Sequence, residues 1–217
     1  MSGTRSVAAP AVFSAEVGTG SAEKTRQSKK ARAVLPFTET ANRAPRASIS
    51  IVVEEPMWHA HEGVIGEIRR AARAAAAAGP TSRRSESDKP ELCILLADDE
   101  YVRELNGRYR QRRKATNVLS FPAAPVFAPR LGDIVLSYGV LCREAAAQGK
   151  SLASHAAHLT IHGVLHLYGY DHQNRREATA MENLEISLLA GLGYSNPYET
   201  VPVRRRSKRP RLSHDRE

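Results

Sequence analysis

The chain has 217 residues and a net charge of +9, and 41% of its residues are hydrophobic and 25% charged, as in a soluble globular protein with one good-sized domain plus extensions, or two small domains. No run of about 18 apolar residues occurs and the first residues lack the apolar core of a secretory signal, so neither a transmembrane helix nor a leader is expected. Cys93 and Cys142 form no Cys-x-x-Cys pair, which indicates buried free thiols in a reducing compartment, the cytoplasm.

The positive charge is concentrated at the two ends of the chain. Residues 1–47 contain eight Lys or Arg and three Glu, and residues 204–217 contain seven Lys or Arg and two acidic residues, so each end carries +5 and residues 48–203 carry −1. These compositions predict a disordered basic extension at 1–47 and a disordered basic tail at 199–217. Such ends either add salt-sensitive affinity for a polyanion or serve solubility alone.

Hydrophobic periodicity and turn residues predict a strand or a helix for most of the segment between these ends. In chain order the predicted elements are a strand at 49–55, a helix from Pro56 to about Ala78, a polar loop at 81–90, a buried strand at 91–98, a short helix capped by Asp98 or Asp99, strands at 117–123 and 132–138 that pair as a hairpin, and helices at about 139–148, 151–168 and 174–190. Strands mixed with helices early, followed by helices alone, suggest one α/β or α+β domain with a small mixed sheet.

One basic cluster lies inside this near-neutral segment. In RYRQRRK, residues 108–114, five of seven positions are Arg or Lys. A charge run of this kind is most often a solvated face of the protein. Because Ser120 and Phe121 follow closely in the chain, contact with phosphate is an equally good interpretation.

The helix predicted at 151–168 carries its histidines on one stripe. His155, His158, His162 and His166 fall at relative angles of about 0°, 300°, 340° and 20°, and apolar residues occupy most of the remaining circumference. A helix that is apolar nearly all round is buried. Its imidazoles must then be hydrogen-bonded, metal-bound or open to a cleft, because burying an unpaired polar group is costly.

Three histidines in HGVLHLYGYDH, residues 162–172, have the spacing of a metal site. His162 and His166 are i and i+4 and so reach one ion from adjacent turns. Gly169 favours a helix end there, after which the chain can fold back to bring a third nitrogen from His172. Three protein ligands leave a fourth position open, which is typical of a catalytic zinc site, although nickel or another divalent ion suits the same ligands.

The same spacing occurs in the metzincin protease motif H-E-x-x-H-x-x-G-x-x-H, but this chain has Gly163 where those proteases have their glutamate base. Peptide hydrolysis by their route is therefore disfavoured. A reaction that develops charge on phosphate, which a metal and an arginine neutralise, fits better.

HGVLHLYGYDH is similar to the signature H-G-x-L-H-L-x-G-Y-D-H of the YbeY family, bacterial endoribonucleases that act in ribosomal RNA maturation. The match is complete at the fixed positions. It is supported upstream, in the family's order, by LNGRYR (105–110), TNVLSFP (116–122) and LGDIVLS (131–137). The resemblance covers roughly residues 48–198 and includes neither basic end.

The resemblance implies an α+β fold, with a single domain at 48–198 in which helices pack a small mixed β-sheet and the metal-binding helix lies in a cleft. It implies that the metal ligands are His162, His166 and His172, and that the family's functional arginine falls on Arg110. The family often has Lys-Pro before the threonine of the second motif, whereas Lys114-Ala115 stands here, which affects loop rigidity alone.

The resemblance leaves neighbouring polar residues in supporting roles. Asp171 either fixes the turn or orients a ligand histidine. His155 and His158 are expected to line the cleft or support the ligands rather than to bind the ion.

The first functional hypothesis is a metal-dependent, single-strand-specific endoribonuclease with one Zn²⁺, acting in maturation of the 3′ end of 16S ribosomal RNA and in ribosome quality control. In this hypothesis Arg110 and His166 are catalytic, and the RNA backbone is bound by Arg108, Arg112, Arg113 and Lys114. Expected partners are single-stranded and ribosomal RNA, small-subunit ribosomal proteins and a ribosome-assembly GTPase, with no membrane and no DNA.

Two alternatives come from other classes. The chain is a non-catalytic ribosome-assembly factor whose metal is structural, an option that the missing base keeps open. Alternatively, it is a metallohydrolase of a peptide or small molecule, which Gly163 argues against.

Overall fold

A computed structural model of the chain describes residues 47–79 and 89–199. The two basic ends and most of the loop predicted at 81–90 lie outside these residues. None of the helices in the described ranges combines the length and the apolar character needed to cross a bilayer.

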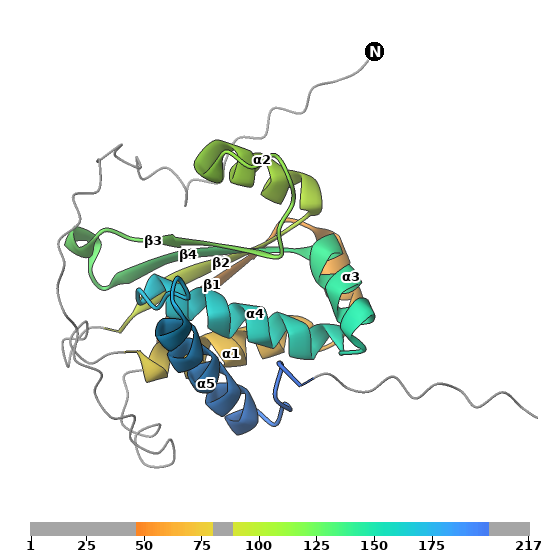
Figure 1. Ribbon diagram of the computed structural model, residues 1–217. Coiled ribbons are helices and arrows are strands. Elements are labelled where there is room, and N and C mark those ends of the chain that lie inside the picture. The colour runs from red at the N-terminus through yellow and green to blue at the C-terminus, as the bar shows by residue number, and fades with distance from the viewer. Residues whose placement is uncertain (1–46, 80–88, 200–217) are drawn as a thin grey trace, which may run out of the picture. The chain divides into compact units, whose positions relative to one another are not determined.

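The described residues form a four-stranded sheet with helices on both faces (Figure 1). The elements in chain order are β1 (Ser48–Val53), the 3-10 helix η2 (Pro56–Ala60), α1 (Val64–Ala78), β2 (Glu91–Ala97), α2 (Asp99–Arg110), β3 (Val118–Pro122), the 3-10 helix η4 (Pro125–Phe127), β4 (Arg130–Ser137), α3 (Tyr138–Gln148), α4 (Leu152–Leu167) and α5 (Arg175–Gly191). The fold class is α+β, as predicted.

The sheet is mixed, with strand order β1-β2-β4-β3. β1 and β4 both pair in parallel with β2, whereas β3 pairs antiparallel with β4, with Ser120 opposite Ile134. The central strands β2 and β4 are buried along almost their whole length, which explains why ELCILLA and LGDIVLS are nearly continuous apolar runs. The predicted hairpin pairing of the last two strands is confirmed.

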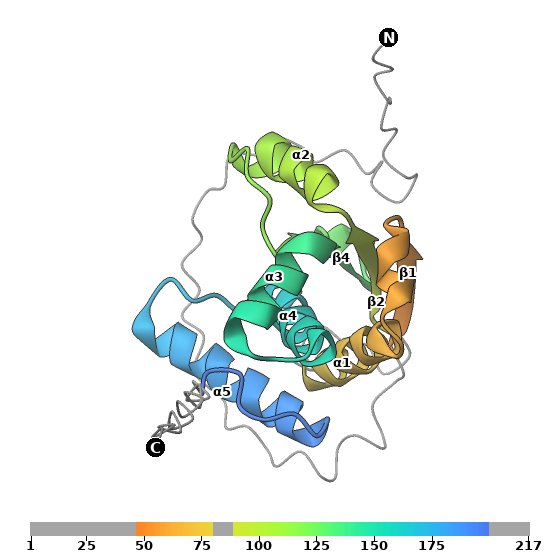
Figure 2. The same cartoon turned by 90° about the vertical axis from the view of Figure 1, so that its right-hand side faces the viewer.

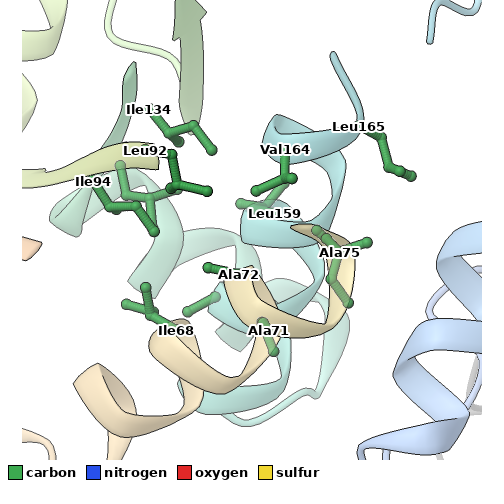
Figure 3. Packing of buried hydrophobic residues seen from close by; sticks show 14 of the residues in the cluster. Ile68, Ala71, Ala72, Ala75, Leu92, Ile94, Ile134, Leu159, Val164 and Leu165 are labelled. Atoms are coloured by element: carbon green, nitrogen blue, oxygen red, sulfur yellow. The ribbon is translucent and has the colours of Figure 1, made fainter. Parts of the chain in front are cut away.

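The helices divide between the two faces of the sheet. α2 covers one face, and α1, α4 and α5 lie on the other side, as two perpendicular views show (Figures 1 and 2). On that second side, Ile94 and Ile134 from the sheet meet Ala72 of α1 and Leu159 and Val164 of α4 (Figure 3). The alanine-rich sequence of α1 serves this packing, because small side chains let two helices and a sheet approach closely.

The predicted single helix from Pro56 to Ala78 is wrong in one respect. It is split into η2 and α1 by Gly63, which has a φ of 78° that favours glycine. Trp58 in η2 is fully buried, so this short helix packs into the core through a side chain of its own. Both cysteines are free, and Cys93 is buried as predicted, while Cys142 is only partly so.

Asp98 and Asp99 have different tasks. Asp98 is the N-cap of α2, because its Oδ1 accepts a hydrogen bond from the Tyr101 N–H at 2.7 Å. Asp99 instead reaches the start of α3. It accepts from the Val140 N–H at 2.9 Å, from Arg143 at 2.7 Å and from the Ser137 hydroxyl.

We predict that Asp99→Asn lowers the free energy of unfolding by about 1–3 kcal/mol at neutral pH, because it replaces a charged acceptor at the junction of α2 and α3. The neighbouring Glu100→Gln is the control, since Glu100 forms only a surface ion pair with Arg103 and should change stability little. Urea denaturation of the two variants and the wild type measures the difference. Equal losses for both variants would contradict the assignment.

The contribution of Asp99 to the free energy of unfolding should depend on pH in a defined direction. Burial raises the pKa of Asp99, but its hydrogen bonds from Ser137, Arg143 and Val140 outweigh burial and hold the pKa below its usual value. The stability from Asp99 is therefore present above the unfolded pKa of the aspartate and is lost as the pH falls through the lower folded pKa. The difference between wild type and Asp99→Asn should shrink over that acidic range.

Candidate metal centre

The structure brings His162, His166 and His172 together. One ring nitrogen from each lies within 4.8 Å of the others. The first two side chains come from the last turns of α4, and the third comes from the segment that joins α4 to α5. This is the predicted grouping, and three converging imidazole nitrogens can hold a metal ion.

The end of α4 returns the chain toward its own last turn. The N–H of Gly169 donates to the His166 carbonyl at 2.9 Å, and the N–H of Tyr170 donates to the Leu165 carbonyl at 3.1 Å. These two bonds form a Schellman motif, which needs a left-handed residue, and Gly169 supplies it with a φ of 85°. The Asp171 carboxylate then accepts from the His172 N–H at 2.8 Å, so Asp171 fixes the turn that presents His172.

Hydrogen bonds determine which nitrogen each helical histidine offers. Nδ1 of His166 lies 2.9 Å from the Tyr170 carbonyl oxygen, and Nδ1 of His162 lies 2.8 Å from Oε1 of Glu185. Because a carbonyl and a carboxylate only accept, both Nδ1 atoms carry the proton. In neutral rings, therefore, both Nε2 atoms present lone pairs.

These two lone pairs face one another, with the Nε2 atoms 3.0 Å apart. Such an approach is repulsive unless a proton on one ring or a metal ion lies between the two nitrogens. Two nitrogens bound at about 2.0–2.1 Å to a tetrahedral zinc lie about 3.3 Å apart, so the observed separation suits two ligands of one ion. Burial and the neighbouring His162 also lower the pKa of His166, which favours the neutral form that binds metals.

Glu185 of α5 is the residue that sequence reasoning missed. It is fully buried, and its carboxylate accepts from His162 at 2.8 Å, from His158 at 2.9 Å and from the Tyr198 hydroxyl. Burial raises its pKa, but these three hydrogen bonds outweigh burial and bring the pKa to about 2. The available signal was its position: a glutamate on the same buried face of α5 as Met181 and Leu188.

The other stripe histidines, His155 and His158, are each hydrogen-bonded through Nε2, whereas their buried Nδ1 atoms have no hydrogen-bond partner among the described residues. Nε2 of His158 lies 2.9 Å from the Glu185 carboxylate, and Nε2 of His155 lies 2.8 Å from the Glu144 carboxylate on α3. Burial lowers the pKa of His155 despite the nearby Glu144 carboxylate. Neither histidine belongs to the group of converging nitrogens.

The basic cluster lies on different elements from the triad. Arg108 and Arg110 are in the last turn of α2, and Arg112, Arg113 and Lys114 follow it. All five are exposed, and in the described part of the chain none of their side chains forms an ion pair. α2 and α4 cover opposite faces of the sheet, and β3 is the edge strand beside both (Figure 1). The roles predicted for these five residues stay predictions.

Gly163 is used for packing. A Cβ at this position would lie 3.1 Å from Cδ1 of Ile134 and 3.2 Å from the Ser120 hydroxyl oxygen, and that hydroxyl donates to the Gly163 carbonyl at 3.2 Å. The second residue of the histidine motif therefore faces the sheet. A larger side chain there would press on Ile134 and Ser120, so glycine suits this position.

A small α+β fold with three imidazole nitrogens around one point, two of them on rings oriented by hydrogen bonds to Glu185 and the Tyr170 carbonyl, is an arrangement that could hold a metal ion. The profile of the family described as Endoribonuclease YbeY matches residues 59–193. The chain belongs to the YbeY family.

Relatives and a solved structure extend this comparison. The chain is 42% identical to Endoribonuclease YbeY of Sinorhizobium fredii over 71% of this chain and 93% of that protein, and 41% identical to that of Rhodopseudomonas palustris over 75% and 81%. It is 51% identical to that of Xylella fastidiosa over 51% and 73%. The solution structure of TM1509 from Thermotoga maritima matches at 19% identity with a TM-score of 0.42, over 73% of this chain and 99% of that one.

We predict that Glu185→Gln weakens metal binding by about 10–100-fold, because an amide cannot accept from two imidazoles and a phenol as a carboxylate does. Competition with a chromophoric chelator measures the affinity. Glu182→Gln, an exposed position on the same helix, is the matched control and should bind like wild type. An unchanged affinity in a folded Glu185→Gln protein would rule out the orienting role.

Two glycines on neighbouring helices should respond to alanine with opposite signs. Gly163→Ala should lower the free energy of unfolding by about 1 kcal/mol, because overpacking against the fully buried Ile134 exceeds the gain in helix propensity. Gly66→Ala on α1 has open space around the new methyl and should raise it by about 0.5–1 kcal/mol. Chemical denaturation of both variants tests this, and stabilisation by Gly163→Ala would contradict the close approach.

Proposed function

We propose that this chain is a metal-dependent endoribonuclease that cleaves single-stranded RNA in the maturation of ribosomal RNA. As a member of the YbeY family it is a hydrolytic endoribonuclease. The observation that supports the metal dependence is the convergence of one ring nitrogen each from His162, His166 and His172 within 4.8 Å of one another.

The ion that we propose is Zn²⁺, one per chain, held by His162, His166 and His172. All-nitrogen ligation by imidazole suits zinc, and other divalent ions suit it too. When bound, the ion supplies Lewis-acid stabilisation of the negative charge that develops on a phosphodiester under attack. The protein's part is to keep the ligands in the correct tautomer, through Glu185 and the Tyr170 carbonyl.

Positive side chains hold the RNA in this proposal. Arg110 steadies the phosphate at the reacting position and acts with His166 as the catalytic pair. The flanking phosphates are bound by Arg108, Arg112, Arg113 and Lys114. Their exposure and their lack of ion pairs within the described residues leave these side chains available to an anionic strand.

The proposal also specifies the RNA substrate and the partners. We propose that the substrate is ribosomal RNA, including the 3′ end of 16S rRNA, and that small-subunit proteins and a ribosome-assembly GTPase are partners in the cytoplasm. The charge of +5 at each end of the chain supports a polyanionic partner. Peptide hydrolysis is disfavoured, because Gly163 packs against Ile134 and Ser120 where a protease has its base.

Cleavage of single-stranded ribosomal RNA by purified protein tests the proposal. We expect His166→Ala to lose activity at least 100-fold through loss of the ion, and Arg110→Glu to lower kcat/KM about 100-fold through loss of charge stabilisation. Arg73→Glu, an exposed position on α1, is the control and should cleave like wild type.

Two outcomes would contradict the proposal. Equal activity in wild type, His166→Ala and Arg110→Glu would remove both the metal and the arginine from the reaction. If chelation lowers the melting temperature while folded ligand variants still cleave, the ion is structural.

A further inference from the structure

A pocket of about 450 Å³ opens between the C-terminal end of α2, the segment after it, and α3. This volume falls in the usual range for small-ligand sites, about 300–1,000 Å³. The pocket contains none of the three metal-binding histidines. The polar side chains that line it are those of Asn106, Arg112, Lys114, Thr116, Asn117, Arg143 and Glu144.

Arg112 and Lys114 line one part of the pocket, and hydrogen bonds to Asn106 hold the backbone of this segment in place. The buried Asn106 side chain donates to the Lys114 carbonyl at 2.7 Å, and the Asn106 carbonyl accepts from the Arg112 N–H at 3.2 Å. Arg143 is already paired with Asp99 at 2.7 Å. Arg112 and Lys114 have no carboxylate partner among the described residues, so this part of the pocket attracts an anion.

The part of the pocket lined by α3 presents an oriented hydrogen-bond acceptor, the carboxylate of Glu144. The Glu144 carboxylate accepts from Asn117 Nδ2 at 3.0 and 3.3 Å and from His155 Nε2 at 2.8 Å, while its side chain is still 34% exposed. A carboxylate has about four acceptor positions, so these two donors leave capacity for a ligand. Because protein groups hold it in place, it can accept from a ligand N–H without reordering.

We propose that this pocket binds one nucleotide of the RNA substrate, with its phosphate on Arg112 and Lys114 and the amino group of its base on Glu144. The inference rests on the proposed endoribonuclease function. A pocket lined by cations and by a fixed carboxylate matches a nucleotide, which has an anionic phosphate and a base edge with N–H donors. Adenine, cytosine and guanine have an amino group and uracil has none, so the pocket should disfavour uracil.

The pocket is an anchor distant from the metal. Glu144 contacts His155 near the start of α4, whereas His166 lies near its end, and the rise between these two positions is about 16 Å. A strand that occupies both sites is held at two points, which fixes its path past the ion. RNA too short to span this distance can occupy the pocket or the metal centre but not both at once.

The first arm of the test measures phosphate binding. Fluorescence anisotropy follows a labelled single-stranded RNA on the full chain, read before products accumulate, at several salt concentrations. We expect the double variant Arg112→Ala, Lys114→Ala to bind about tenfold more weakly, with a salt slope reduced by about 0.7 for each phosphate that the variant no longer neutralises. Arg73→Ala, which removes an exposed arginine on α1, should change neither the affinity nor the slope.

The second arm measures base recognition with Glu144→Gln. Wild type should bind an RNA with adenine or cytosine in place of uracil up to about tenfold more tightly than oligouridine of the same length. Glu144→Gln should lose most of that difference and should bind oligouridine like wild type. Circular dichroism checks that each variant is folded.

The outcomes separate this proposal from the proposed function. If wild type cleaves RNA but the pocket variants bind like wild type, the pocket is overturned together with the phosphate-binding roles of Arg112 and Lys114, while the endoribonuclease activity itself stands. An effect of Arg112 and Lys114 without any change of base preference in Glu144→Gln also overturns the nucleotide pocket. If wild type does not cleave, the proposed function fails, while the salt slope and base preference still decide whether the pocket takes a nucleotide.

Discussion

The buried carboxylate of Glu185 is the constraint on which the metal centre depends. An ionised carboxylate without solvent is costly, and this one is stable because His158, His162 and Tyr198 all donate to it. The bond to His162 places the proton of that ring on Nδ1 and so directs Nε2 toward His166. The contact between α4 and α5 and the chemistry of the triad thus follow from the same hydrogen bonds.

A histidine near the other end of α4 is also held by a glutamate from a neighbouring helix. Glu144 of α3 accepts a hydrogen bond from His155, as Glu185 of α5 accepts from His158 and His162, so two carboxylates from two helices support a single row of imidazoles. Glu144 also borders the pocket, and Glu185 stands behind the triad. The row of histidines on α4 therefore connects the pocket with the three-histidine group. Of its four members, only His162 and His166 belong to that group.

Local patterns in the sequence predicted most of the elements and the metal triad, because helix period, glycine stops and ligand spacing are local properties. The break at Gly63 was missed, since the alanine-rich run that follows it favours helix so strongly. Glu144 and Glu185 were missed for another reason: one glutamate in a helix is ordinary, and only tertiary packing shows that it faces a histidine. The placement of α2 and α4 on opposite faces of the sheet is likewise a property of the whole fold.

Gly163 separates this centre from the proteases that share its histidine spacing. On this chain the second position of the motif lies close to Ile134 and Ser120, so the helix that carries His162 and His166 lies close against the sheet and a larger side chain at this position would press on it. Peptide hydrolysis needs such a group to move a proton to a poor leaving amine. Phosphodiester cleavage depends more on neutralising charge around the phosphate, which an ion and arginines supply. The glycine at this position and a basic cluster without ion pairs among the described residues therefore favour the same chemistry.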